Sequence, residues 1–325
     1  MAHKLDSERV LATVDWADAV LIEHRLESGY AVDARLNQQR NLRRRTGPQP
    51  GKFARYQRGD CVPSQQVVDL LDTRGGLSVG RLKHPLYTVL RVGWDSRKQW
   101  QARDDLENAL IDTERWLSLR LTRFVDHGWT YERRPLSPTM LESLAATGTG
   151  HALTALLTAA VQQADYGEDP RLAIQRAFHC MVLAFARGEF RLTWPLVAAR
   201  VRQQILDRIV VDGLVADTAA FDLIPALVSA RRMLKEMQAG GALRAADQRT
   251  YVRSWLRSHV DSHANWQLAF VTPEAAALSL RGRPVALRME SRPTGQFNHM
   301  RDFGRRAKAV LAPALGDYVI EPCEA

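Results

Sequence analysis

Apolar residues recur at helical spacing near the start of the chain. The apolar positions there stand three or four residues apart: Val10, Val14, Ala17 and Leu21. Ser7 can cap a helix and Gly29 can end one, so this pattern predicts a helix over residues 7–27. Ser64 follows Pro63 and is a good cap for a second helix, which is predicted to run to Leu71.

The same spacing continues through the middle of the chain. A long helix is predicted after Ser96, carrying Phe124 on its apolar face and ending at His127-Gly128. Further helices are predicted over residues 151–164, 170–187, 194–211, 218–238 and 245–260.

The pattern changes after Asn265. Apolar and polar residues then alternate over residues 266–270 and 285–290, which predicts two half-buried strands. A further helix is expected over residues 298–311 and a third strand at residues 318–320. The sequence therefore predicts a mostly α-helical protein in three parts: an N-terminal helical module (1–94), a helical domain (95–260) and a small mixed α/β element (261–325).

Charge adds a preference for polyanionic partners. The 325 residues carry a formal net charge of +9, and the sequence pI is about 9.8. Such an excess favours nucleic acid or an acidic membrane surface, although it also simply keeps a protein in solution. No apolar run of about 18 residues is present, so no membrane span is expected. Three dispersed cysteines, Cys61, Cys180 and Cys323, fit a reducing cytoplasm and suggest neither a disulfide framework nor a zinc ribbon.

Basic residues concentrate between Arg35 and Pro63. No acidic residue stands between Asp33 and Asp60. The cations of this stretch are Arg35, Arg40, Arg43, Arg44, Arg45, Lys52, Arg55 and Arg58. This one-sided charge makes the segment a candidate for binding nucleic acid.

The spacing of other residues in the same stretch resembles a known motif. The matching positions are Gln39, Leu42, Gly47, Phe53, Tyr56, Gly59 and Pro63. In this order they resemble the helix-turn-helix of lambda-repressor-like regulators, over about residues 36–72. The chain departs from the pattern at Arg43, where the family usually has a small residue.

The resemblance implies a fold and a mode of binding. Leu42 and Phe53 would be buried between two crossing helices, with Tyr56 packed beside them. Gly47 would allow a left-handed turn, Gly59 would end the second helix and Pro63 would begin the next. In such proteins the second helix lies in the major groove of DNA. The residues implied to face the DNA are Gln49, Lys52 and Arg55, and those implied to contact phosphates are Arg40, Arg44 and Arg58. Regulators of this kind bind as homodimers, and the region after residue 95 would supply dimerisation or contact a protein partner.

Other interpretations remain open. Residues 47–51 can be read as a flexible loop and the arginines as a solvated surface. The module can also have kept its fold and lost DNA binding, which would make the chain a non-catalytic helical interaction component, for instance of a larger bacterial system. No Walker loop, GxGxxG, GxSxG or HExxH motif is present, so catalysis is not expected, although an enzyme of another type stays open. His259 and His263 stand four residues apart, but two ligands do not make a metal site, and no cofactor or metal is predicted.

Overall fold

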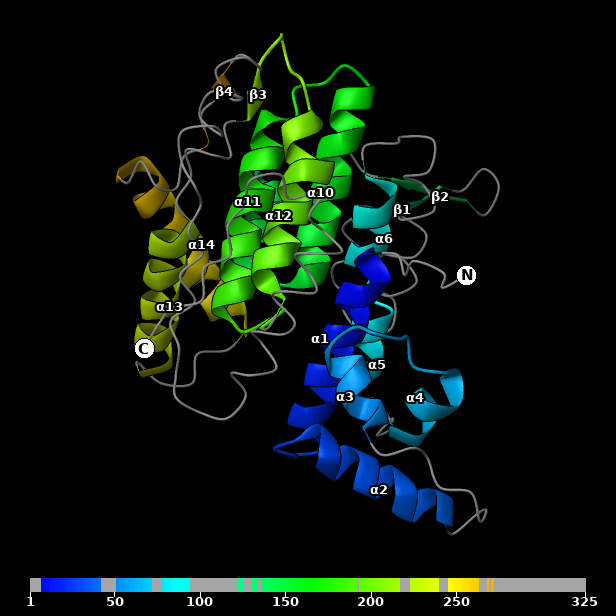
Figure 1. Cartoon of the computed structure of the whole chain (residues 1–325). Coiled ribbons are helices and arrows are strands. Elements are labelled where there is room, and N and C mark those ends of the chain that lie inside the picture. Colours follow the sequence, from blue (N-terminus) through cyan, green and yellow to red (C-terminus); the bar gives the residue numbers. More distant parts are fainter. Residues whose placement is uncertain are drawn as a thin grey trace. The chain divides into compact units, whose positions relative to one another are not determined.

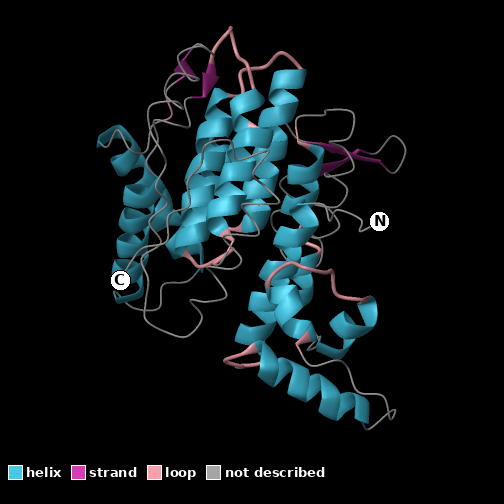
Figure 2. Ribbon diagram, in the orientation of Figure 1, coloured by secondary structure: helices cyan, strands magenta, loops and turns pink. Residues whose placement is uncertain are grey.

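The computed structural model describes residues 7–41, 51–71, 77–93, 122–125, 130–133, 136–191, 193–216, 223–239, 245–262, 268 and 270–271. Most of these residues are helical, which confirms the predicted helical character (Figures 1 and 2). Among them, no helix is both long enough and apolar enough to cross a bilayer.

The chain forms two compact units. The first contains residues 1–87 and 284–325 together with a short later segment, Arg191–Ala199, and the second contains residues 88–190 and 200–283. The boundaries expected at residues 94 and 260 stay predictions, because residues 94–121 and most of those after 262 lie outside the described part. The same holds for the α/β element expected over 261–325, of which only residues 261–262, 268 and 270–271 are described.

The first unit opens with two longer helices, and the helices described after them are short. In chain order these helices are α1 (Ser7–Glu23), α2 (Gly29–Asn41), α3 (Lys52–Gln57), α4 (Gln65–Leu71), α5 (Leu77–Leu82) and α6 (Pro85–Val92), which begins in this unit. Helix α1 packs against α3 and α5, and α2 packs against α3 and α4. The starts expected at Ser7 and after Ser64 are confirmed.

Helix α11 (Arg171–Ala186) lies at the centre of the second unit. It is apolar around almost its whole circumference, and such a helix must be covered by neighbours on several sides. It contacts α9 (Pro138–Thr147), α10 (Gly150–Asp165) and α13 (Leu223–Ala239), while α14 (Ala245–Ser262) packs on α9. Ser137 and Thr149 cap α9 and α10 through their side-chain oxygens.

The helix predicted over residues 194–211 ends earlier in the structure than expected. Helix α12 (Trp194–Gln204) stops well before residue 211 and is followed by a 3-10 turn, η1 (Leu206–Arg208). The backbone then pairs Val211 with Leu214 in an isolated bridge. Val210 and Val211 are β-branched and favour extended backbone, which explains why the helical spacing does not carry through.

The strands are not confined to the region after Asn265, which corrects the expected pattern. Strands β1 (Thr122–Val125) and β2 (Thr130–Arg133) form an antiparallel hairpin in which Thr122 pairs with Arg133. The helix expected to continue through Phe124 is therefore wrong over β1. Threonine, valine and aromatic residues dominate this stretch, and cross-strand pairing outweighs a helical spacing of leucines further upstream. A second pair joins β3 (Val215–Ala216) to β4 (Phe270–Val271), the latter near the strand predicted over 266–270.

Candidate nucleic-acid interface

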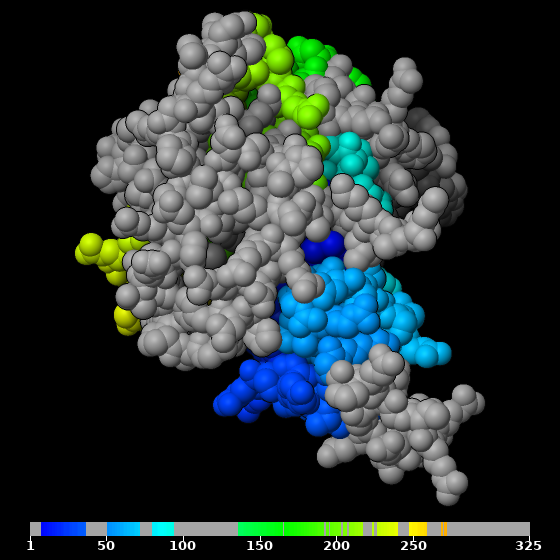
Figure 3. Space-filling model, viewed as in Figure 1, coloured from blue at the N-terminus to red at the C-terminus, as the bar shows by residue number. Residues whose placement is uncertain are grey.

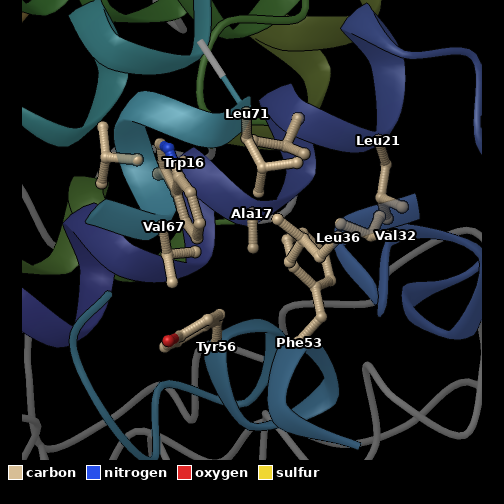
Figure 4. Close-up of a cluster of buried hydrophobic side chains, with 11 residues drawn as sticks. Trp16, Ala17, Leu21, Val32, Leu36, Phe53, Tyr56, Val67 and Leu71 are labelled. Carbon is tan, nitrogen blue, oxygen red and sulfur yellow. The ribbon is translucent and has the colours of Figure 1, made fainter. Parts of the chain in front are cut away.

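An aromatic cluster fixes α3 to the first unit. Phe53 and Tyr56 of α3 are buried, as the resemblance implied, and both rings contact Trp16 of α1 (Figure 4). The ring centroids of Trp16 lie 5.8 Å from Phe53 and 5.6 Å from Tyr56, and the Phe53 and Tyr56 rings meet edge to face at 6.1 Å. These are favourable geometries for aromatic pairs. The rest of the cluster comes from α1, α2 and α4: Ala17, Val20, Leu21, Val32, Leu36, Val67, Val68 and Leu71.

A carboxylate from another helix caps α3. Asp33 lies in α2 and is buried, and its side chain accepts hydrogen bonds from the backbone N–H groups of Gly51 and Phe53, both at 3.0 Å. The first N–H groups of a helix have no partner within the helix, and a negative charge near them is favourable. Asp33 therefore satisfies the start of α3 across 18 residues of chain.

Two glycines shape the ends of α3. Gly51 precedes the helix in a left-handed conformation, with φ of 85°, which glycine adopts without steric strain. Gly59 follows the helix at φ of 70°, and a Cβ atom there would lie 2.5 Å from Cγ1 of Val10. Any side chain at residue 59 would thus meet both backbone strain and a close contact with α1.

The outer face of α3 is basic. Because Phe53 and Tyr56 point into the core, Lys52 and Arg55 lie on other sides of the helix, Lys52 partly exposed and Arg55 exposed. Arg58 follows the helix and forms an ion pair with Asp60 at 3.0 Å, with both side chains largely covered. A phosphate contact from Arg58 would have to compete with this pair.

Cys61 stands beside these cations. Burial raises the pKa of the Cys61 thiol, and the positive charge of nearby Arg55 opposes that shift only in part. The residue is half-buried and forms no disulfide with Cys180, the other cysteine among the described residues. Cys61 therefore combines a raised thiol pKa with a position close to the basic face.

The remaining residues of the predicted interface divide into two groups. Gln39 and Arg40 lie within α2, and Pro63 is buried just before the start of α4. Four others lie outside the described residues: Leu42, Arg44, Gly47 and Gln49. The expected contact of Leu42 with Phe53 and the expected turn at Gly47 therefore stay predictions.

Sequence reasoning missed two residues that hold α3. Asp33 entered only as the acid that bounds the basic stretch, and Trp16 was not singled out. The sequence does contain a signal for Trp16, since it is next to Ala17 on a helix with an apolar face. It contains none for Asp33, because a cap supplied from another helix has no fixed spacing.

A second polar cluster lies elsewhere in the first unit. The buried carboxylate of Asp15 accepts hydrogen bonds from the Tyr87 hydroxyl at 3.0 Å and the Thr193 hydroxyl at 3.4 Å, and Arg81 lies 3.9 Å away. These groups approach the carboxylate of Asp15 from several directions, which is typical of a structural polar contact.

The second unit has its own network of charges. Glu142 of α9 pairs with Arg176 of α11 and Arg257 of α14 at 3.3 and 2.6 Å. His179 and Cys180 are buried within α11, where the Cys180 thiol lies within 4 Å of the carbonyls of Leu144 and Thr149. His259 belongs to α14, whereas His263 lies outside the described residues. Over the part of the chain that the structure describes, no three His, Cys, Asp or Glu side chains gather as a metal site would require.

Comparison of the chain with protein-family models, with curated proteins and with solved structures finds no match. Arguments about function therefore rest on the residues of this chain.

Proposed function

We propose that the protein binds duplex DNA through the basic stretch 35–58 and acts as a transcriptional regulator. The observation that carries the proposal is the division of α3 into two sides. Phe53 and Tyr56 are buried against Trp16, and Lys52 and Arg55 are left on the outside of the same helix.

The nearby carboxylates are already paired within the protein and would not strongly repel a polyanion. Asp33 is turned inward, where the N–H groups of Gly51 and Phe53 surround it, and Asp60 is paired with Arg58. Within the described residues of this stretch, the exposed charge is therefore positive. In the space-filling view the residues of α2 (blue) and of α3 and α4 (lighter blue) are visible at the surface (Figure 3).

The length of α3 limits what it can read. Six residues at about 1.5 Å per residue give a helix of about 9 Å, which spans roughly three base pairs at 3.4 Å each. Arg55 is the exposed side chain suited to a guanine, because its guanidinium can donate two hydrogen bonds to O6 and N7. Most of the affinity would come from phosphate contacts by the surrounding cations, with modest sequence preference.

The test is a binding assay on duplex DNA across a series of salt concentrations, with RNA as a competitor. Each phosphate contact contributes about 0.9 to the slope of log K against log salt. Replacing Arg40, Arg44 and Arg58 together by alanine should flatten this slope and weaken all duplexes alike. Arg55→Ala or Gln49→Ala should weaken a preferred duplex more than random DNA.

Arg232→Ala provides a matched control. Arg232 is a highly exposed arginine of the second unit, paired with Glu236 of its own helix, so its removal tests the effect of losing a positive charge outside the basic stretch. No binding of duplex DNA at low salt would contradict the proposal and would favour a non-catalytic protein-interaction role.

Alkylation of Cys61 independently tests whether DNA binds at the basic face of α3. Because Cys61 lies close to Arg55 and Lys52, duplex DNA bound there should slow its reaction with iodoacetamide, as followed by peptide mass spectrometry. An unchanged rate at saturating DNA would place the bound duplex elsewhere.

A further inference from the structure

Helix α3 has no stabilising cap of its own. Its N-cap residue is Gly51, which offers no side chain, and a helix of six residues is far below the length at which an isolated helix is stable in water. The start of α3 is held instead by Asp33 from α2, whose two carboxylate oxygens accept from Gly51 and Phe53.

The two hydrogen bonds flank Lys52. The N–H groups before and after this residue are both bound to one buried carboxylate, so the backbone of Lys52 has a fixed position relative to α2. The other end of the helix is fixed by Tyr56 in the aromatic cluster and by the close approach of Gly59 to Val10. Asp33 thus holds the first turn of α3, next to Lys52, while Phe53 and Tyr56 anchor the same helix in the aromatic cluster.

We infer that Asp33 is a positioning residue for DNA recognition. It contacts no DNA, and it orients α3 so that Lys52 and Arg55 face the duplex together. The inference rests on the proposed function and deepens it, because it assigns the sequence preference to an orientation fixed by a carboxylate of α2.

A loss of orientation differs measurably from a loss of charge contacts. Removing a phosphate contact changes the salt slope, whereas rotating the recognition helix impairs base contacts and leaves the number of phosphates neutralised nearly the same. The ratio of affinities for a preferred duplex and a random duplex therefore reports on Asp33, and the salt slope serves as the internal reference.

The experiment uses the full chain and a duplex enriched by selection from a random pool. Asp33→Ala should lower the ratio of preferred to random affinity by about ten-fold, the usual effect of losing one base contact, with the salt slope unchanged. Asp33→Asn keeps one acceptor oxygen and should lose less. Asp69→Asn is the matched control, since Asp69 is an exposed carboxylate of α4 that accepts a hydrogen bond from Gln65 in its own helix.

Amide hydrogen exchange shows whether Asp33 holds the start of α3, independently of whether it affects DNA recognition. In Asp33→Ala the N–H groups of Gly51 and Phe53 should exchange faster than in the unaltered protein, whether or not DNA is present. If Asp33→Ala does not fold, the affinity ratio and the exchange rates are both measured on Asp33→Asn.

The outcomes are distinct. Unchanged exchange at Gly51 and Phe53, or an unchanged affinity ratio, would overturn the positioning role. Failure of the unaltered protein to bind any duplex would overturn the proposed function and the recognition role with it, and the exchange rates would still show whether Asp33 holds α3.

Discussion

Arg191 donates two hydrogen bonds to the carboxylate of Asp18, although the residues are 173 positions apart in the chain. Nη2 lies 2.7 Å from Oδ1 and Nε lies 3.3 Å from Oδ2. Asp18 is buried in α1, and two positions beyond Arg191 the Thr193 hydroxyl donates to Asp15. The first unit is therefore completed by a segment that the chain supplies much later.

Removing Arg191 should destabilise the first unit. Arg191→Ala leaves the buried carboxylate of Asp18 without its two charged donors, which should cost about 1.5–3 kcal/mol of unfolding free energy. Arg191→Lys keeps the charge and loses the paired geometry, so a smaller loss is expected. Urea denaturation measures both. Arg232→Ala, at an exposed pair within one helix, should change stability by less than about 0.5 kcal/mol, and an equally small effect at Arg191 would contradict the structural role.

A fragment that ends at residue 94 should not fold stably. It contains α1 to α6 but lacks Arg191 and Thr193, the donors to Asp18 and Asp15, and it lacks the buried apolar residues that follow them, among them Leu196 and Val197. Circular dichroism and urea denaturation of the fragment should show no cooperative transition. A folded, cooperative fragment would mean that residues 191–199 are dispensable for the first unit.

Tyr87 should make stability fall at high pH. Burial raises the pKa of the Tyr87 phenol well above its ordinary value of 10, and the negative charge of Asp15 raises it further. The folded protein therefore keeps the proton at a pH where the unfolded chain has lost it. The resulting stabilisation is complete below pH 10 and is lost as the pH rises through the pKa of the folded state.

Tyr87→Phe tests this prediction. The variant should lose about 1–3 kcal/mol at neutral pH, because one donor to the buried Asp15 is gone. Its unfolding free energy should then decline less steeply above pH 10 than that of the unaltered protein. Parallel declines in the two proteins would show that Tyr87 does not control the alkaline limb.

Phe53 should be among the largest contributors to the stability of the first unit. Phe53→Ala removes a fully buried ring in contact with Trp16 and Tyr56, and such truncations cost about 3–5 kcal/mol. Tyr30→Ala is the control, since Tyr30 is 74% exposed at the start of α2. A cost under about 1 kcal/mol at Phe53 would mean that α3 is not anchored, and the helix-turn-helix interpretation would fall with it.

Local spacing was enough to predict several features of the molecule. The repeats of apolar residues predicted α1, α10, α11, α13 and α14 to within a few residues, because a helix satisfies its own backbone hydrogen bonds. The resemblance around the basic stretch implied that Phe53 and Tyr56 are buried and that the helix ends at Gly59, and the structure has these features, although the burial itself comes from distant residues such as Trp16.

Tertiary structure decided what near neighbours do not control. The β1–β2 hairpin replaced the end of an expected helix, because a strand at Thr122–Val125 gains its hydrogen bonds from a partner strand. The carboxylate of Asp33 became the cap of α3, and Arg191 became the partner of Asp18 across most of the chain. Such contacts depend on which distant surfaces meet when the core forms, and no spacing in the sequence encodes that meeting.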